Sequence, residues 1–414
     1  MSKKKVYLIG IGMGGNGTLT ECARKQIETS EILIGAKRML EGLVTEDKEC
    51  FISYKADEIG AYLKGKETFR QAAILLSGDV GFYSGAKKLL KELEPFEVEL
   101  IPGISSMVYF CSRLQVAWED VCFASAHGKN VNQIQRIKRH RKCFFLLDGA
   151  AGLNRLCEKL LYYGMWDVTL HVGENLSYKE ERIVSGSPDQ VKDLFVSSLA
   201  VVLAENPNPE NWAARSIPDS DFIRTKVPMT KSEVRTVSIG KLQLKADSTV
   251  YDVGGGSGSV SIEMALQAPD IQVYSIEKKE AALQLMEANK RKFAADNMEI
   301  VEGTAPEAFE TLPAPTHAFI GGSSGNMKEI IDCILSKNPD CRIVINTIAL
   351  NSLAEVLAIL EQYADYGHEI IQLQTSVSKR VAGYEMMTGQ NPIYIVTLYR
   401  RNRSQENTVQ EVFQ

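Results

Sequence analysis

Short apolar runs recur along the first half of the chain, and each is followed by a longer stretch of mixed apolar and polar positions. Such runs, bounded by turn-forming residues, predict buried β-strands, and the longer stretches predict helices. The predicted strands are residues 6–9, 31–34, 73–76, 98–101, 144–147, 168–172 and 200–203. Two of the predicted helices are residues 85–93 and 152–163. This alternation predicts an α/β fold with helices on the faces of a sheet.

The second half repeats the alternation without an evident sequence repeat of the first. Its predicted strands are residues 249–253, 273–277, 298–302, 318–320, 342–346, 369–374 and 393–398. Between the halves, Asn206-Pro207-Asn208-Pro209 suits neither helix nor strand, because proline lacks an amide hydrogen and restricts its neighbour. We therefore predict a first domain at 1–206, a linker at 207–217, a second domain at 218–400 and a polar tail at 401–414.

Composition and charge narrow the class of protein. The 414 residues are 44% hydrophobic and 24% charged with a formal net charge of -5, so no basic field indicates a nucleic-acid partner. No apolar run approaches the roughly 18 residues of a membrane helix, and we expect a cytoplasmic protein with no membrane partner. The eight cysteines form no C-x-x-C pair and lie in apolar segments, which favours reduced, buried thiols over disulfides or a metal site.

A glycine-rich turn in the second half suggests a nucleotide-type cofactor. The predicted strand 249–253 runs directly into Gly254, Gly255 and Gly256, and Gly258 follows Ser257. A Cβ in such a turn would keep the backbone away from a ligand. The spacing is G-x-G-x-G, whereas dinucleotide sites show G-x-G-x-x-G. A cofactor with one nucleoside and no pyrophosphate fits better, so S-adenosylmethionine is predicted ahead of NAD.

Polar residues follow the other predicted strands of this half. Glu277 lies 21 residues after Gly256, where a carboxylate would meet the hydroxyls of a ribose, although a surface acid at a strand end is the alternative. Asp252 would order the turn or meet the cationic end of the cofactor; otherwise it caps the next helix. The turn 303–307 could frame an adenine or serve only as a connection. The glycine- and serine-rich loop 319–326 and Asn346 face the same predicted crevice.

These segments, together with Met229-Thr230-Lys231-Ser232-Glu233-Val234-Arg235, resemble the decarboxylating C15 methyltransferases of cobalamin biosynthesis over about residues 218–400. The resemblance implies a Rossmann-like class I methyltransferase sheet that binds S-adenosyl-L-methionine. The candidate cofactor contacts are Thr230, Asp252, Gly254, Gly255, Gly256, Ser257, Gly258, Glu277, Thr304 and Ala305.

The first half carries several small-residue loops after predicted strands. Gly10-Ile11-Gly12-Met13-Gly14-Gly15 matches G-x-G-x-x-G, which by itself is a weak sign of a dinucleotide site. Four further loops, at residues 77–85, 101–106, 125–129 and 172–177, also follow predicted strands. Each could be only a turn, but we expect the four to converge on one edge of a sheet.

This set resembles the tetrapyrrole methylase family over about residues 5–206, and residues 173–176 and 180–183 favour its C5-methylating branch in cobalamin biosynthesis. The resemblance implies a two-lobed fold, unrelated to the class I sheet, that also binds S-adenosyl-L-methionine. The chain has Met13 and Val80 where the family often has proline. The residues implied to line the cofactor cleft are Gly12, Gly78, Asp79, Phe82, Ser105 and Ser106.

Together the halves resemble the family of fused enzymes that methylate precorrin-6B, or its cobalt form, at C15 with loss of the C12 acetate carboxylate and then at C5. Homologues of each half are oligomeric, which implies a homo-oligomer. Two alternatives stay open. One is methyl transfer to another tetrapyrrole or to RNA, and the other is a half that binds S-adenosylmethionine without catalysis.

Six residues are candidates for catalysis or substrate contact. A polycarboxylate substrate needs cationic partners, and Lys231 and Arg235 are the first candidates, ahead of Lys379 and Arg380. The alternative for each is exposed surface charge. Asn346 is a further candidate in the second half. In the first half, His127 could transfer a proton in the predicted cofactor cleft or have only a structural role. No general base is assigned.

Overall fold

The computed structural model describes residues 4–401, except 15, 42, 44–47, 127–130, 195, 197–199, 213–215 and 324. The chain divides into two compact units, one of Met1–Val131 with Ile137–Pro209 and one of Asn132–Arg136 with Glu210–Gln414. The linker assigned to 207–217 stays a prediction. Among the described residues, none of the helices has the length and apolar content needed to cross a bilayer.

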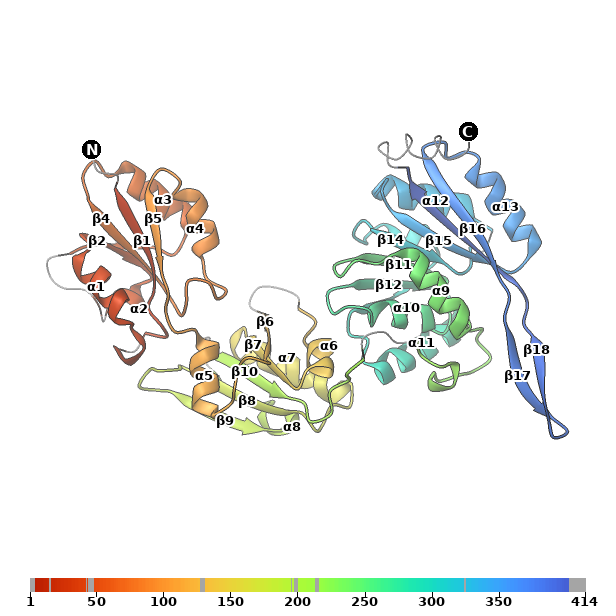
Figure 1. The fold of residues 1–414 in the computed structure, drawn as a ribbon, viewed down its shortest axis with the longest axis horizontal. Helices are drawn as coiled ribbons and strands as arrows, with labels where there is room; N and C mark the ends of the chain where they lie inside the picture. Colours follow the sequence, from red (N-terminus) through yellow and green to blue (C-terminus); the bar gives the residue numbers. More distant parts are fainter. Residues whose placement is uncertain are drawn as a thin grey trace, which may run out of the picture. The chain divides into compact units, whose positions relative to one another are not determined.

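The first unit begins with a parallel five-stranded sheet (Figure 1). Its strands, in spatial order, are β3 (Glu49–Ile52), β2 (Ile32–Gly35), β4 (Gln71–Leu76), β1 (Lys5–Gly10) and β5 (Glu97–Ile101). The connecting helices are η1 (Asn16–Thr18), α1 (Glu21–Thr29), α2 (Lys37–Leu40), α3 (Ala56–Gly65) and α4 (Ala86–Glu92). Alternate residues of β1 enter different hydrophobic cores, because successive side chains of a strand point to opposite faces.

A second sheet of five strands completes the first unit. Its strands, in spatial order, are β6 (Cys122–Ser125), β7 (Lys142–Leu146), β10 (Ala200–Glu205), β8 (Thr169–Glu174) and β9 (Arg182–Gly186). The helices are α5 (Ser106–Leu114), α7 (Gly149–Tyr162) and α8 (Pro188–Val191), together with the end of α6 (Gln133–Arg139), whose first four residues belong to the second unit. Only β6 and β7 pair in parallel, and β10 runs antiparallel to both of its neighbours.

This second sheet corrects one expectation about the small-residue loops. The loops after residues 76 and 101 leave the first sheet, whereas those after residues 125 and 174 leave the second, so they do not share one sheet edge. Strands β6 and β9 were not predicted: β9 has only two successive apolar residues, and the apolar run at residues 121–124 that forms most of β6 is short and only partly buried. The four loops can meet only where the two sheets face a common space.

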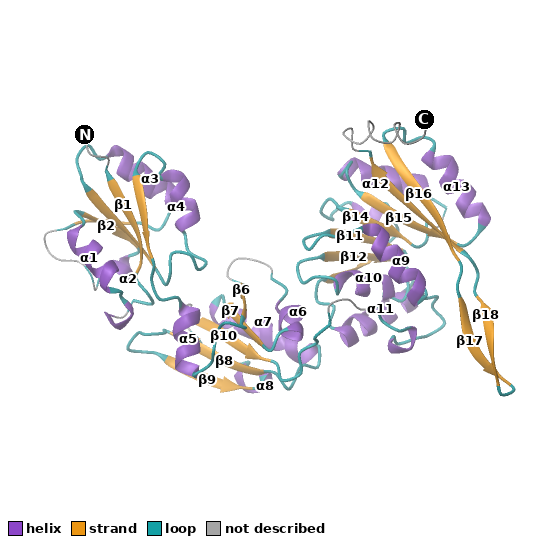
Figure 2. Cartoon of the chain, viewed as in Figure 1, coloured by secondary structure: helices purple, strands orange, loops and turns teal. Residues whose placement is uncertain are grey.

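The second unit is built on one seven-stranded sheet with helices on both faces (Figure 2). Its strands, in spatial order, are β13 (Met298–Glu302), β12 (Gln272–Glu277), β11 (Thr249–Val253), β14 (His317–Ile320), β15 (Arg342–Thr347), β19 (Ile393–Arg400) and β16 (Tyr366–Leu373). All pairings from β13 to β15 are parallel, and β19 is antiparallel to both neighbours. The order reverses beside β11, as in doubly wound sheets that bind nucleotides, which confirms the predicted fold class.

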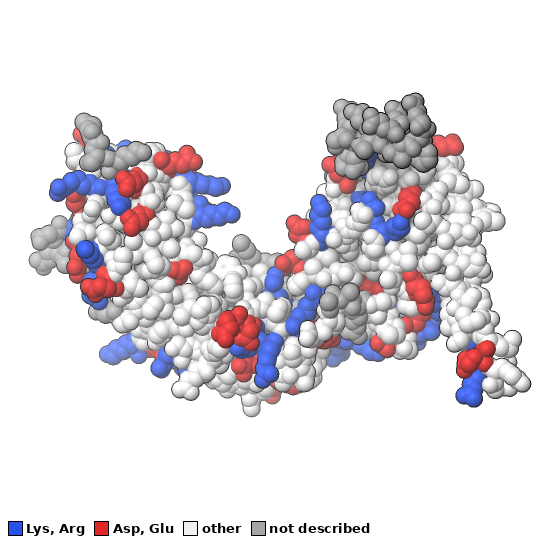
Figure 3. Space-filling model, in the orientation of Figure 1, with Lys and Arg blue, Asp and Glu red and all other residues white. Residues whose placement is uncertain are grey.

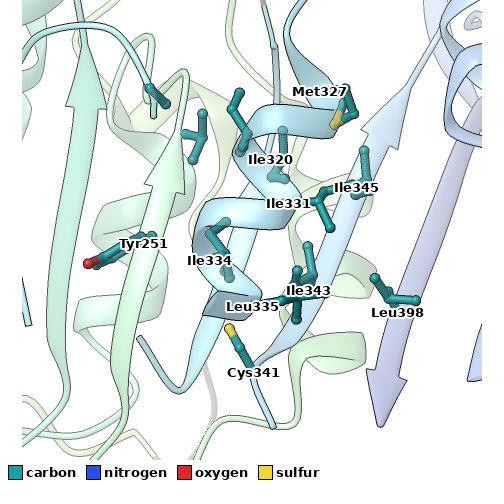
Figure 4. Close-up of a cluster of buried hydrophobic side chains, with 14 of the residues drawn as sticks. Tyr251, Ile320, Met327, Ile331, Ile334, Leu335, Cys341, Ile343, Ile345 and Leu398 are labelled. Carbon is teal, nitrogen blue, oxygen red and sulfur yellow. The ribbon is translucent and has the colours of Figure 1, made fainter. Parts of the chain in front are cut away.

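Two hydrophobic cores cover the faces of this sheet. The helices are η2 (Asp219–Asp221), α9 (Ser232–Leu242), α10 (Ser259–Ala265), α11 (Glu280–Phe293), η3 (Glu307–Phe309), α12 (Met327–Lys337) and α13 (Leu350–Leu360). Helices α12 and α13 pack on the face that carries Tyr251 and Ile343 (Figure 4). Helices α9, α10 and α11 pack on the other face, with Val250 and Val344. Burial on both faces explains the continuous apolar runs of these strands.

An exposed hairpin extends from the seven-stranded sheet. Its strands, β17 (Ser376–Val381) and β18 (Tyr384–Gly389), pair only with each other, and all their residues are exposed. Figure 3 shows most of this hairpin as uncharged, with both charge signs toward its end. Lys379 and Arg380 lie on β17. The hairpin was not predicted, because it has no buried face to produce an alternating pattern.

Candidate functional site

The larger cavity of the second unit opens where β11, β12, β14 and β15 end. It has a volume of about 1180 Å³, slightly more than the roughly 300–1000 Å³ of most small-molecule sites. The carboxyl ends of parallel strands beside an order reversal are where doubly wound sheets bind ligands. Seven of the ten predicted cofactor contacts line it: Thr230, Asp252, Gly254, Gly255, Gly256, Ser257 and Glu277.

The glycine turn is held against the neighbouring strand β12. The amides of Gly254 and Gly255 both donate to the carbonyl of Ile276, at 3.0 and 3.1 Å. A Cβ on Gly255 would collide with Ser275 Oγ, and Gly254 and Gly256 have φ values of +78° and +54°. Glycine is therefore favoured at three successive positions, at Gly255 for a steric reason and at Gly254 and Gly256 for a conformational one. The result is exposed backbone along one wall of the cavity.

Glu277 is an ordered carboxylate on the same wall. Its Oε2 accepts the amide of Gly256 at 3.0 Å, and its Oε1 accepts the amides of Lys278 and Lys279 at 2.9 and 3.0 Å. These bonds fix the side chain at the end of β12 and leave acceptor capacity on Oε2, because each carboxylate oxygen has two lone pairs and Oε1 already accepts two amides. Glu277 lines the cavity from the end of β12. Its role with a ribose stays a prediction.

Asp252 lies beneath the turn and is almost fully buried. Burial raises its pKa to about 6, against the opposing effect of a hydrogen bond from Ser261 Oγ on α10. Gly258 occupies the N-cap position of α10, but the Asp252 carboxylate also accepts a hydrogen bond from the backbone amide of Ser261 in the first turn of that helix. Among the described residues, Asp252 Oδ1 and Ser257 Oγ are buried without a hydrogen-bond partner, and both residues line the cavity. Buried polar atoms of this kind favour a polar ligand.

Thr304 and Ala305 line a smaller hollow of about 50 Å³ on the other side of Glu277. Gly254 and Glu277 line both spaces, so the two adjoin. The predicted loop 319–326 contributes to both, through Gly322. Gly258 is the one predicted contact that lines neither. Its φ is +77°, and a Cβ there would lie 2.7 Å from Met286 Cγ, so this glycine permits close packing of α10 on α11.

Arg235 does not lie where its predicted role requires. Its side chain is fully buried, and both substrate contact and the alternative of exposed charge are therefore wrong. Its guanidinium donates to Glu263 at 2.8 Å, to Asp219 at 2.7 Å and to the carbonyls of Thr230 and Ile217, both at 2.5 Å. Burial raises the pKa of Glu263, and the Arg235 charge works against that rise. Arg235 thus holds the segment that carries Thr230.

Of the other predicted polar candidates, Lys231 and Asn346 lie at the cavity, whereas Lys379 and Arg380 lie on the exposed strand β17 and do not line it. Lys231 lines it, is partly exposed and makes a 3.4 Å ion pair with Asp219. The Asn346 side chain exchanges hydrogen bonds of 2.9 and 3.1 Å with Ser238 Oγ on α9. Sequence reasoning missed three further lysines that line the cavity: Lys226, Lys278 and Lys279. The last two follow Glu277 directly, a signal that was present in the sequence.

The first unit holds a separate cavity of about 320 Å³. Loops from both of its sheets line it, as a two-lobed fold requires. Of the six predicted contacts, three line the cavity: Gly78, Phe82 and Ser106. His127, the predicted proton-transfer group, lies outside the described residues.

The remaining three predicted contacts shape the loops around this cavity. The backbones of Gly12 and Gly78 bond to each other in both directions, at 3.1 and 2.6 Å. Asp79 accepts the amide of Gly81 at 2.8 Å and that of Gly103 at 3.0 Å, which ties the loops after β4 and β5 together. Ser105 caps α5 by accepting the amide of Val108 at 3.2 Å. None of the three lines the cavity, so we assign them to its support.

A cation that sequence reasoning missed also faces this cavity. Arg38, on α2, donates from Nη1 to Tyr178 Oη at 2.8 Å, and both residues line the cavity. The two lie 140 positions apart in the chain, so no local motif could have joined them. An arginine beside a tyrosine offers several donors for a carboxylate.

Comparison with known proteins gives matches to both units. The family model for the precorrin methyltransferase domain matches residues 221–400, and that for tetrapyrrole (corrin/porphyrin) methylases matches residues 5–192. The chain is 27% identical over 402 residues to the decarboxylating precorrin-6Y C(5,15)-methyltransferase of a Sinorhizobium species, covering 94% of each.

Two further matches cover the second unit. The decarboxylating cobalt-precorrin-6B C(15)-methyltransferase of Salmonella typhimurium is 36% identical over 197 residues, which are 47% of this chain and 99% of the relative. A crystal structure of a precorrin-6y C5,15-methyltransferase from Geobacter metallireducens is 35% identical, with a TM-score of 0.43, and the match covers 46% of this chain and 97% of that one.

Proposed function

This chain belongs to the precorrin methyltransferase family, and on that premise we propose that it methylates a precorrin-6B-type tetrapyrrole twice. The second unit adds a methyl group at C15 and removes the carboxylate of the C12 acetate. The first unit then adds a methyl group at C5. Either the metal-free or the cobalt-containing ring is a candidate substrate, because relatives with both names match.

One observation carries this proposal: a single chain contains two distinct cavities, one in the second unit lined by loops that leave parallel strands and one in the first unit lined by parts of both of its sheets. A protein with one transferase activity needs one such site. Two sites on unrelated sheets fit two successive transfers to different positions of the same ring.

The residues of the second unit fit S-adenosyl-L-methionine. The fit rests on a glycine turn that a Cβ would obstruct, an ordered acidic side chain at Glu277, and the buried partnerless atoms of Asp252 and Ser257. When bound, this cofactor supplies an electrophilic methyl group on a sulfonium. We propose that Glu277 accepts hydrogen bonds from the ribose hydroxyls, that the Gly254–Gly256 backbone borders the cofactor, and that Thr304 and Ala305 border its base.

Substrate recognition requires cations, since precorrins carry many carboxylates. In the second unit Lys226, Lys231, Lys278 and Lys279 line the cavity and can pair with them. In the first unit we assign this role to Arg38, with Tyr178 as a neutral donor beside it. The chemical step asks mainly for alignment of the methyl group with a nucleophilic ring carbon, an effect of orientation. Asn346, which Ser238 holds in place, can position the ring by its amide.

Mass spectrometry of the product tests the proposal directly. The full chain is incubated with precorrin-6B and S-adenosyl-L-methionine, and the cobalt form is run in parallel. We expect a gain of two methyl groups and a loss of one carbon dioxide. An Arg38→Gln variant should accumulate the product with one methyl group and no C12 carboxylate, while Lys37→Gln, a matched control on the exposed side of α2, should not. No mass change with either substrate would overturn the assignment.

We also propose that the chain forms a homo-oligomer through the β17–β18 hairpin. A two-stranded hairpin in water is marginal by itself, and this one exposes Tyr384, Met386 and Met387. A second copy of the hairpin would cover these side chains and pair the open edges. Light scattering of a Tyr384→Ser, Met387→Ser double variant should show a lower mass than the parent chain. An unchanged mass would exclude the hairpin as the interface.

A further inference from the structure

Three residues with metal-binding side chains meet in the second sheet of the first unit. The ligand atoms of Cys122, His140 and Cys143 all lie within 4.8 Å of one another. We propose that these residues bind a divalent cation of the zinc class, with two sulfur ligands, one nitrogen ligand and a fourth position open to solvent. The proposal is independent of methyl transfer, because cation binding involves neither cavity described above.

Strand pairing brings the two cysteines together. Cys122 begins β6 and is the register partner of Cys143 in β7, which runs parallel to it. Partners on neighbouring parallel strands project their side chains to the same face of a sheet. His140 lies three residues before Cys143, between the end of α6 and the start of β7. The chain thus supplies a local His-x-x-Cys pair and a third ligand from the adjacent strand.

The backbone around the three ligands is well anchored. Lys142, next to Cys143, donates to the carbonyl of Ala117 at 2.7 Å and pairs with Asp120 just before β6. On the other side, Asn206 donates to the carbonyl of Arg141 at 2.8 Å from its backbone and to that of Ile137 at 2.8 Å from its side chain. These bonds hold the segment that carries His140 between two fixed points, which lowers the entropy cost of assembling a site.

The spacing suits a tetrahedral cation. With zinc–sulfur bonds of about 2.3 Å and zinc–nitrogen bonds of about 2.0 Å, the ligand atoms of such a site lie roughly 3.5–3.8 Å apart. Side-chain movements of about 1 Å therefore close the cluster around an ion. Thiolate and imidazole ligands favour zinc and neighbouring transition metals over magnesium or calcium, which prefer oxygen.

Burial of the ligands is graded from the sheet to the solvent. Cys143 is fully buried, Cys122 is half-buried and His140 is exposed. The exposed histidine gives the ion a path of entry and leaves the fourth position to water. Each thiol that binds loses its proton to solvent, so binding forms two metal–sulfur bonds and releases two thiol protons.

The metal site would stabilise the edge strand β6. β6 is four residues long and pairs only with β7, so few backbone bonds hold it. Ser125, at the other end of β6, lines the cavity of the first unit together with Leu146 of β7. A bound cation would join the starts of β6 and β7, and the ends of these two strands form part of the wall of the first-unit cavity. Binding to the folded state alone would also stabilise the unit.

Cobalt(II) is the probe for the experiment, because its complexes with thiolates absorb strongly in the near ultraviolet. The full chain is treated with a chelator and a reductant, and Co²⁺ is then titrated. We expect one equivalent per chain, a sulfur-to-cobalt charge-transfer band, visible bands of a tetrahedral complex, and displacement of all of these by Zn²⁺.

Variants decide whether the predicted residues are responsible. Cys122→Ser and His140→Gln should each weaken Co²⁺ binding at least tenfold and weaken or shift the charge-transfer band. Cys50→Ser, at an exposed cysteine outside the cluster, should leave both unchanged. His140 is exposed, so its variant tests the site without disturbing the core. Binding without a charge-transfer band, equal binding by all variants, or a Cys122–Cys143 disulfide in the untreated chain would each overturn the proposal.

Discussion

Both units have a glycine-rich turn directly after a parallel strand, but the two turns have different structural roles. After β11, a Cβ on Gly255 would meet only side-chain ends, Ser275 Oγ and Met286 Cε, and Gly256 has no neighbour closer than 3.4 Å. After β1, a Cβ on Gly10 would lie 2.7 Å from the carbonyl oxygen of Gly78 and 2.8 Å from the amide of Gly103. One turn opens its backbone to a cavity, and the other packs backbone on backbone.

The comparison shows that a glycine motif after a strand identifies a tight turn but not its ligand. In the second unit the turn itself forms the wall of the cavity. In the first unit the glycines bring three loops together, and side chains from two sheets then line a smaller space. A motif match in the first half alone would have suggested a dinucleotide site where the structure has backbone packing.

The largest effect should come from the buried cation of the second unit. Arg235→Met leaves the buried Glu263 without its cationic partner and leaves Asp219 only its pair with Lys231, and we expect a loss of about 3–5 kcal/mol in the free energy of unfolding of that unit. Lys231→Met, which removes a partly exposed pair with Asp219, should cost less than about 1 kcal/mol. Denaturant unfolding measures both, and equal losses would contradict the structural role of Arg235.

The pH dependence of the second unit should show two opposing contributions. The pKa of Asp252 rises from 3.8 to about 6, so the stability that it contributes is complete below pH 4 and falls as the pH rises to 6. Burial and nearby Arg342 and Lys245 lower the pKa of His317 from 6.5 to about 4, so its contribution is complete above pH 6.5 and falls as the pH drops to 4.

Single variants separate these contributions. The stability difference between the parent chain and Asp252→Asn should shrink by about 3 kcal/mol from pH 4 to pH 7, at about 1.4 kcal/mol for each unit of pKa. The difference between the parent and His317→Gln should grow by a similar amount over that range. Unfolding titrations at several pH values measure both slopes. Slopes of the same sign would refute the opposite pKa shifts of Asp252 and His317. The stability of the first unit should show neither of these two pH dependences.

Alanine substitutions in the two turns should reproduce the contrast between them. Gly10→Ala pushes a Cβ against backbone atoms that cannot rotate away, and we expect the first unit to lose about 2 kcal/mol of stability. Gly255→Ala meets side-chain atoms, Ser275 Oγ and Met286 Cε, which can rotate away at the cost of the Ser261–Ser275 hydrogen bond, so we expect it to cost less stability but to reduce cofactor binding. Gly240→Ala, in the open interior of α9, should stabilise the second unit by up to about 1 kcal/mol. A larger loss for Gly255→Ala than for Gly10→Ala would reverse the interpretation.

The smallest effect should be on cofactor affinity in the second unit. Glu277→Gln keeps the shape of the side chain but weakens acceptance from ribose hydroxyls, and we expect a rise of roughly tenfold in the Kd for S-adenosyl-L-methionine, or about 1.4 kcal/mol. Calorimetry should show this loss for one of two sites. Glu280→Gln, on an exposed acid one residue into α11, serves as control. Equal Kd values for both variants would remove Glu277 from the proposed site.

Much of the second-unit site was predictable because it is local. The strand 249–253, the glycine turn and Glu277 belong to consecutive elements whose order in the chain matches their order in the sheet. Arg235 was misassigned because its partners, Asp219 and Glu263, are distant in sequence, and nothing in the sequence around these two acids indicates that they are buried. Arg38 and Tyr178 were missed for the same reason.

The amino-acid sequence by itself determined the α/β class, most strands, the two glycine turns and the family, since each depends on hydrophobic period or on residues close together in the chain. Only the tertiary structure decided that the first half holds two sheets, that Arg235 is interior, and that Cys122, His140 and Cys143 meet. Those facts depend on which distant segments pair, and pairing is set by the packing of whole elements.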